Sequence, residues 1–169
     1  MRVKRLLAAA LTAALTASLL VLPAWAAPGS FSDVPDQATA VNADILRLMG
    51  VVNGTGGNQF NPGDTLTRAQ FCTMAVRFLQ REDEAARYAT RTIFSDVSSG
   101  HWARSYVNLA ASTSVGEGDN VQPLISGVGD GRFLPDNSIN LAESVTILLR
   151  ILGYTGKEAG AVWPQGYLD

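Results

Sequence analysis

The sequence predicts a mainly α-helical, exported protein built from tandem helix–turn–helix repeats with short glycine-rich turns. Three observations lead to this prediction: an apolar N-terminal leader, a set of short motifs that occurs twice in the same order, and apolar residues at helical spacing after each motif. The chain has 169 residues, of which 47% are hydrophobic and 17% are charged. This length and apolar share suffice for the core of one domain or of two small ones.

Composition excludes several functional classes. The formal net charge of −2 leaves no surplus of lysine and arginine to displace counterions from phosphate, so nucleic acid is not an expected partner. Cys72 and His101 are single residues of their types, which rules out an intrachain disulfide and disfavours a structural zinc site. We therefore expect no catalytic residues, no metal and no cofactor, and predict that the protein is not an enzyme.

The first 26 residues have the layout of a secretory signal peptide. Three cations lie within Met1–Arg5, an uncharged apolar run follows over Leu6–Leu22, and Ala24-Trp25-Ala26 is a small-x-small cleavage triplet. We predict cleavage after Ala26 or Ala27, which would place the mature chain outside the cytoplasm. The alternative is an uncleaved membrane anchor, for which the apolar run is at the lower limit of length.

A repeat is visible after the leader. The motif FSDV at 31–34 returns at 94–97, and the glycine-rich segment 54–62 matches 127–135. The residues paired in the glycine-rich segments, and in the matches further along the chain, have numbers that differ by 73. Units this small usually stack on neighbouring copies. The predicted organisation is a signal peptide (1–26), a first repeat (27–80), a connector (81–93), a second repeat (94–156) and the start of an incomplete third repeat (157–169).

Each predicted repeat begins with a helix and continues into a tight turn. In the first, Val41, Ile45, Leu48 and Met49 follow the i, i+4, i+7, i+8 spacing of an amphipathic helix. Turns are expected at Gly57-Asn58 and Asp130-Gly131, because these residue types tolerate positive φ. The additional residues of the second predicted repeat, between Ser112 and Ser126, are expected to form an inserted loop.

A second helix follows in each predicted repeat. Thr67 and Gln70 have the spacing of a capping box, and Asn140 and Glu143 repeat it. Helical spacing predicts a buried stripe in both helices, formed by Phe71, Met74, Ala75, Phe78 and Leu79 and by Ser144, Ile147, Leu148, Ile151 and Leu152.

These motifs together resemble the S-layer homology domain. F-x-D-V, a helix, a glycine-rich turn, F-x-P and a T-R-A-(E/Q) helix start occur in this order in that family, and the resemblance spans residues 31 to about 154. It implies that three copies, where present, form a pseudo-threefold bundle. It also implies that grooves between copies bind a secondary cell-wall polymer, often through a pyruvylated sugar.

The resemblance therefore implies non-covalent anchoring of a secreted protein at the bacterial cell wall or surface layer. The expected partners are a secondary cell-wall polymer or a peptidoglycan-linked glycan, and further S-layer homology repeats in the same chain or another. The alternative function is a structural protein–protein module that assembles a surface layer or envelope complex. A small secreted enzyme is disfavoured by the residue inventory.

Arg68 occupies the place of the family's polymer-binding arginine. A guanidinium at a helix N-terminus suits a carboxylate, because two parallel charge-assisted hydrogen bonds add to the helix dipole. Leu141 takes this place in the second predicted repeat, so we expect that groove to lack its anion ligand. The candidate polymer-binding residues are Arg68, Gln70, Asp33, Asp96, Trp102 and Glu143.

Several of these residues also have purely structural interpretations. Arg68 could simply face solvent in the first turn of its helix. Asp33 and Asp96 precede helices, where capping of backbone N–H groups is favoured over polymer binding. Trp102 could stack on a sugar ring or fill the core between repeats, and the core is slightly favoured. Cys72 is expected to be an inert buried thiol.

Overall fold

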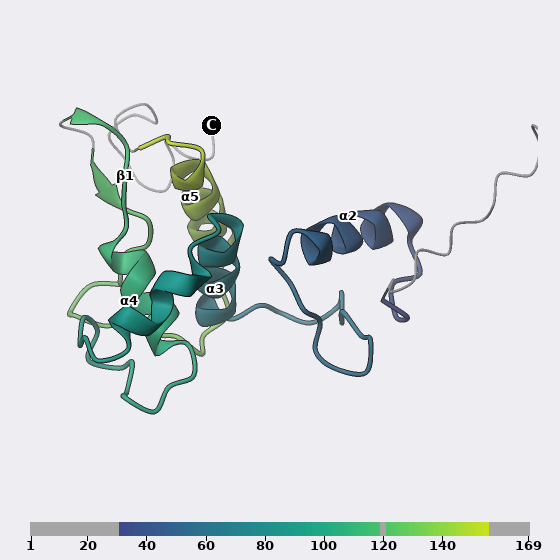
Figure 1. The fold of residues 1–169 in the computed structure, drawn as a ribbon, viewed down its shortest axis with the longest axis horizontal. Helices are drawn as coiled ribbons and strands as arrows, with labels where there is room; N and C mark the ends of the chain where they lie inside the picture. The colour runs from purple at the N-terminus through teal and green to yellow at the C-terminus, as the bar shows by residue number, and fades with distance from the viewer. Residues whose placement is uncertain (1–30, 119–120, 156–169) are drawn as a thin grey trace, which may run out of the picture. The chain divides into compact units, whose positions relative to one another are not determined.

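The computed structural model describes residues 31–118 and 121–155. The predicted signal peptide and the predicted start of a third repeat lie outside the described residues. Four α-helices, one 3-10 helix and one two-stranded sheet make up the described part (Figure 1), which agrees with the predicted mainly α class. No described helix has the length and hydropathy needed to span a membrane. The elements are α2 (Gln37–Leu48), α3 (Arg68–Phe78), η1 (Glu82–Tyr88), α4 (Arg104–Ser112), β1 (Ser114–Val115), β2 (Gln122–Pro123) and α5 (Leu141–Ile151).

Helix α2 lies where the apolar spacing predicts it. The Asp36 side chain caps its start by accepting a 2.7 Å hydrogen bond from the Thr39 amide. The helix buries Ala43, whereas the predicted apolar stripe is exposed: Val41 by 51%, Ile45 by 48% and Leu48 by 82%. The helix prediction is therefore confirmed, but the apolar stripe faces solvent in the described part of the chain.

Helices α3 and α5 begin with the predicted capping boxes. Thr67 Oγ1 accepts from the Gln70 amide at 3.2 Å, and Gln70 Oε1 accepts from the Thr67 amide at 2.8 Å. Asn140 and Glu143 exchange the corresponding bonds at 2.9 Å and 3.1 Å. Both boxes are confirmed, and they show that glutamine and glutamate can each complete the box as the third helical residue.

The main hydrophobic core joins the two predicted repeats. Helix α3 packs against both α4 and α5, and η1 packs against α4, so these helices gather into one group in Figure 1. Cys72 is buried, as expected, and burial raises the pKa of its thiol to about 12; its lack of reactivity stays a prediction. The fully buried core side chains include Ala69, Cys72, Val107, Leu109, Leu124, Ile125 and Phe133.

The predicted buried stripes of α3 and α5 are only partly correct. Phe78 is 42% exposed, and Leu148 and Leu152 are 50% and 68% exposed. In α3, Cys72 and Val76 are buried instead, because the helix turns this face toward α4. Periodicity gives the apolar side of a helix, but the packing partner decides which part of that side is covered.

The turns and the insertion have defined structures. Gly57 and Asn58 have φ of 56° and 62°, and Asp130 and Gly131 have φ of 48° and 75°, as the turn prediction requires. The insertion contains an antiparallel β1–β2 hairpin rather than a loop alone. The Leu124 amide extends this pairing through a 2.8 Å bond to the Thr113 carbonyl.

A buried arginine holds the connector against α4. Arg104 is 8% exposed and donates from Nε to the Ala89 carbonyl at 3.0 Å and from its guanidinium to Thr92 Oγ1 at 2.8 Å. It also donates to the Val97 carbonyl. These acceptors lie on both sides of the connector's end, so one guanidinium fixes the path from η1 to α4.

Candidate functional site

Two cavities lie beside the glycine-rich loops of the two predicted repeats. The first has a volume of about 330 Å³ and the second about 380 Å³. Every residue that lines the second cavity, except Arg68, has a counterpart 73 positions earlier that lines the first. The paired linings are 52–55 with 125–128, Phe60 with Phe133, Leu66 with Ile139, Gln70 with Glu143, Thr73 with Thr146, Met74 with Ile147 and Arg77 with Arg150.

Asp33 and Asp96 hold the loops that form these cavities. Asp33 accepts hydrogen bonds from the amides of Phe60 and Asn61 at 2.8 Å and 2.7 Å, and these bonds lower its pKa. Neither aspartate caps a helix, so that expectation is wrong: Asp36 caps α2, and no side chain caps α4. Each aspartate instead accepts hydrogen bonds from two backbone amides just after the turn and so holds this segment in place.

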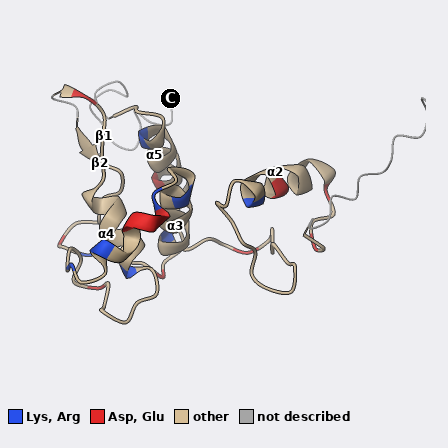
Figure 2. Cartoon of the chain, in the orientation of Figure 1, with Lys and Arg blue, Asp and Glu red and all other residues tan. Residues whose placement is uncertain are grey.

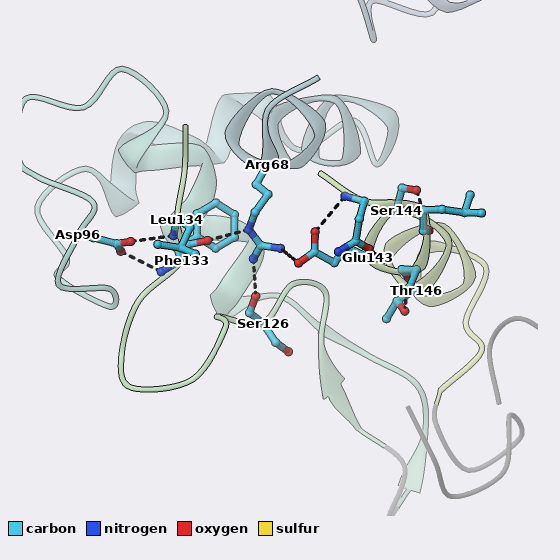
Figure 3. Close-up of polar contacts among 11 residues, drawn as sticks. Arg68, Asp96, Ser126, Phe133, Leu134, Glu143, Ser144 and Thr146 are labelled. Atoms are coloured by element: carbon cyan, nitrogen blue, oxygen red, sulfur yellow. Dashed lines mark hydrogen bonds and ion pairs between the residues drawn. The ribbon is translucent and has the colours of Figure 1, made fainter. Parts of the chain in front are cut away.

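Asp96 makes the same pair of contacts in the second predicted repeat. It accepts from the amides of Phe133 and Leu134 at 2.8 Å and 2.7 Å (Figure 3). Burial acts to raise its pKa, but the amide hydrogen bonds together with the positive charge of Arg132 leave the pKa below its usual value. Neither aspartate lines a cavity, so a direct contact with polymer stays a prediction that the geometry does not favour.

Each loop also needs a glycine. A Cβ atom on Gly54 would lie 2.6 Å from the Gln59 carbonyl oxygen and 2.6 Å from the Phe31 ring. A Cβ atom on Gly127 would lie 2.4 Å from the Arg132 carbonyl oxygen. The backbone of each loop therefore packs closely on its own turn, which leaves no room for a side chain at either glycine.

Arg68 is a wall residue of the second cavity. It is only 6% exposed, and Nε donates to the Phe133 carbonyl at 2.7 Å. Its two terminal nitrogens contact the Ser126 carbonyl at 3.2 Å and Glu143 Oε1 at 2.5 Å (Figure 3). The guanidinium carbon lies 4.7 Å from the centre of the Phe133 ring. The interpretation of Arg68 as a solvent-facing residue is therefore wrong, while its role in polymer binding stays a prediction.

The position of Arg68 shows that the second cavity does not depend on Leu141 for an arginine. The arginine belongs to the first predicted repeat, but its guanidinium lies in the cavity of the second. Leu141, the residue in the corresponding place, is 72% exposed and does not line this cavity. Leu141 therefore does not leave the second cavity without an arginine, because Arg68 of the first predicted repeat lines it; whether this cavity binds an anion stays a prediction.

Gln70 and Glu143 serve both the helix start and the cavity. Each completes its capping box, and each lines one cavity. Glu143 also neutralises Arg68, with side-chain exposures of 17% and 7%. Gln70 has no formal charge, so the first cavity lacks the carboxylate that the second has at this point.

Trp102 lies at the edge of the first cavity. It is 57% exposed and stacks on His101 with ring centres 5.9 Å apart. The expectation that Trp102 fills the core is wrong, because the indole is exposed to solvent and packs one face against the His101 ring. An exposed indole can stack on a sugar ring, so its role in polymer binding stays a prediction.

The six candidate residues thus fall into three groups. Arg68 and Glu143 meet in the second cavity, Gln70 and Trp102 line the first, and the two aspartates lie beneath the loops.

Sequence reasoning did not select Arg150, which lines the second cavity and donates to the Pro123 carbonyl at 3.0 Å and to Ser126 Oγ at 3.2 Å. The available signal was the pairing of Arg77 with Arg150 across the repeat.

The second cavity has a positive electrostatic balance. Arg68 comes from α3 and Arg150 from α5, and Figure 2 shows cations on both helices. Glu143 is the single acid among the residues that line this cavity. Across the described ranges 31–118 and 121–155, no group of three or more His, Cys, Asp or Glu residues could hold a metal ion. The arrangement can bind a small anionic group through guanidinium hydrogen bonds but offers no assembled nucleophile.

Comparison with known proteins gives a consistent picture. The S-layer homology domain family matches residues 49–72. The chain is 34% identical to a cell surface protein of Thermoanaerobacter kivui, over 98% of this chain and 20% of that protein. It is 30% identical to a surface layer protein of Brevibacillus choshinensis, over 90% of this chain and 13% of that protein. It is 28% identical to a cellulosome-anchoring protein of Acetivibrio thermocellus, over 74% of this chain and 25% of that protein.

The chain spans a quarter or less of the length of these three relatives. No solved structure gives a significant match. The shared region contains the glycine-rich loop of the first cavity and the start of α3.

Proposed function

We propose that this chain, which is an S-layer homology domain protein of the cell surface, binds a pyruvylated secondary cell-wall polymer in its second cavity. Non-covalent binding of this kind would hold a secreted protein on the bacterial cell wall. The family match and the surface-layer and anchoring relatives support anchoring at the cell surface. The two tandem copies, the start of a third and the polymer are parts of the proposal.

One observation supports the choice of a pyruvylated polymer as the ligand. Arg68 and Arg150 line a single cavity of about 380 Å³, and Glu143 is the single acid among the residues that line it. This volume is within the range of small-ligand sites, about 300–1,000 Å³. A pyruvyl ketal carries one carboxylate, which a guanidinium can bind through two parallel hydrogen bonds. The sugar ring would lie against the apolar wall that Ile139 and Ile147 provide.

The two arginines would have different tasks. Arg68 is committed to two carbonyl groups and is paired with Glu143, so it forms a fixed part of the cavity wall. Arg150 donates to Pro123 and Ser126 and is less buried than Arg68. We therefore propose Arg150 as the principal carboxylate ligand, with Arg68 holding the loop that lines the cavity.

The test is a titration of the full chain with purified pyruvylated wall polymer. A parallel titration uses the same polymer after mild acid has removed the pyruvyl group. We expect binding to the first and much weaker binding to the second. Arg150→Ala should weaken binding by about 1.5–3 kcal/mol, the usual contribution of a hydrogen bond to a charged group.

The matched control is Arg87→Ala, which removes one exposed arginine on η1 that lines neither cavity. This variant should bind like the unaltered chain. Equal binding to both polymers, or equal losses in the two arginine variants, would contradict the proposal and indicate attraction by overall charge.

Further S-layer homology repeats are the second class of partner that we propose. Helices α2 and α5 expose large apolar side chains, among them Leu48 at 82% and Leu141 at 72%. Apolar faces of this kind are typical of repeat units that stack on neighbours.

A further inference from the structure

We infer that Glu82 determines the ligand specificity of the first cavity, because it binds Arg77 and so closes this cavity to the carboxylate that the second cavity takes. The inference rests on the proposed function, since it concerns the same class of ligand. It adds that the chain has one site for a pyruvyl carboxylate and not two, although both cavities have an arginine at the same place.

The two arginines occupy equivalent positions. Arg77 and Arg150 are 73 positions apart, and each lines the cavity of its own predicted repeat. The amides of Gln80 and Gly153 donate to the Arg77 and Arg150 carbonyl groups at 2.9 Å and 3.0 Å. Gln80 and Gly153 both have positive φ, of 56° and 88°. The correspondence between the two predicted repeats therefore continues beyond the ends of α3 and α5.

The first arginine is bound to an acid. Arg77 Nε and Nη2 lie 3.1 Å and 3.0 Å from Glu82 Oε1, and the Tyr106 hydroxyl donates to the same oxygen at 2.5 Å. A ligand carboxylate binds a guanidinium through two adjacent N–H groups of this kind. Glu82 therefore holds the side of Arg77 that such a ligand would use.

Glu82 carries its negative charge at neutral pH. The hydrogen bond from Tyr106 lowers the pKa of Glu82, and the hydrogen bond and charge of Arg77 lower it further, whereas burial acts in the opposite direction. The pair is partly exposed, with side-chain exposures of 21% for Arg77 and 44% for Glu82. The arginine of the first cavity is therefore neutralised by a carboxylate of the chain itself.

Arg150 has different partners in the second cavity. Its Nη1 donates to the Pro123 carbonyl at 3.0 Å and to Ser126 Oγ at 3.2 Å, and both acceptors are uncharged. Its Nε is buried and has no hydrogen-bond partner among the described residues. Thr155, whose side chain has no charge, stands at the position that corresponds to Glu82. The nitrogen that Glu82 binds in the first predicted repeat is therefore unpaired in the second.

A second acid adds to the difference between the cavities. Asp64 lines the first cavity, and the residue at the corresponding position of the second predicted repeat is the uncharged Asn137. The lining of the first cavity thus has one cation and one anion, and Glu82 adds a further negative charge beside Arg77. The lining of the second cavity has two cations and one anion. Because like charges repel, a carboxylate is disfavoured in the first cavity and favoured in the second.

The test gives the first cavity the charges of the second. Asp64→Asn combined with Glu82→Thr introduces the residues found at the corresponding positions of the second predicted repeat. The background is the full chain with Arg150→Ala, which removes the proposed carboxylate ligand of the second cavity. The double substitution should tighten binding to purified pyruvylated wall polymer by about tenfold, as for one hydrogen bond to a charged group. Binding to the polymer without its pyruvyl group should not change.

The matched control is Glu84→Thr in the same background. Glu84 belongs to the same 3-10 helix and pairs with Arg81 at 2.7 Å, and neither of these two residues lines a cavity. This control removes the same charge as Glu82→Thr and should not tighten binding. Arg77→Ala, added to the double substitution, should abolish the increase in affinity. Circular dichroism and urea unfolding confirm that each variant is folded.

Two results would overturn the inference. The first is that the folded double variant binds pyruvylated polymer no more tightly than its background. The second is that its affinity rises, but equally without Arg77 or equally in the Glu84→Thr control.

The same measurements distinguish this inference from the proposed function. If Arg150→Ala alone leaves polymer binding unchanged, the proposed function fails at the second cavity, and an increase that depends on Arg77 still supports the role of Glu82. If Arg150→Ala weakens binding and the double substitution restores none of it, the inference alone fails. Absence of binding by every variant would refute the proposed function and the inference that rests on it.

Discussion

Replacing Arg68 by alanine should destabilise the protein strongly. The side chain is 6% exposed, and its removal leaves two loop carbonyl groups and the Glu143 carboxylate without their donor. Removing one partner of a buried ion pair costs about 3–5 kcal/mol. Glu143 retains 17% exposure and adjoins a cavity that water can enter, so we expect about 3 kcal/mol. Because domains of this size are stable by about 5–15 kcal/mol, this is a large fraction of the total.

Urea unfolding followed by circular dichroism measures this loss in the full chain. Leu141→Ala is the matched control, since Leu141 is 72% exposed in the corresponding first turn and should change the free energy of unfolding by less than about 0.5 kcal/mol.

Glu143→Gln in the Arg68→Ala background should restore part of the stability. It removes the unpaired charge, while Gln70 shows that glutamine supports the same capping box. A loss below about 0.5 kcal/mol for Arg68→Ala would refute the reasoning, because such a value is typical of a surface residue.

Two further predictions concern Asp96 and Cys72. The folded-state pKa of Asp96 is lowered, so its contribution to the free energy of unfolding is present above the unfolded-state pKa and is lost as pH falls through the folded-state value. Urea midpoints should therefore fall as the pH is lowered below about 4, the ordinary carboxyl pKa, and less steeply in Asp96→Asn than in the unaltered chain; parallel slopes would contradict this. Cys72, buried with a pKa of about 12, should react with a thiol reagent only on unfolding, and rapid labelling of the folded protein would show that the thiol is accessible.

The start of α3 determines where the Arg68 side chain lies. Thr67 and Gln70 fix the first turn of α3, and this turn aims Arg68 away from its own loop and into the next one. A single side chain of the first predicted repeat thus reaches the second cavity. A motif that looks local in the sequence acts on a distant segment of the chain.

Local features of this protein are determined by the sequence alone. The capping boxes at Thr67 and Asn140 and the positive φ angles at Asn58 and Asp130 depend on residues within a few positions of one another. The position of α2 and the mainly helical class follow from apolar spacing, which is also a local property. The repeated motifs were enough to indicate the family, because their order and spacing are specific.

The tertiary structure determined where each candidate side chain lies. Arg68 enters the cavity of the second predicted repeat because α3 packs against α4 and α5, and its hydrogen bonds reach residues 65 and 58 positions away. Trp102 is exposed, and Asp33 clamps a loop instead of a helix, for the same reason. Periodicity and capping report how a segment folds on itself, whereas burial and charge pairing depend on which distant segment lies against it.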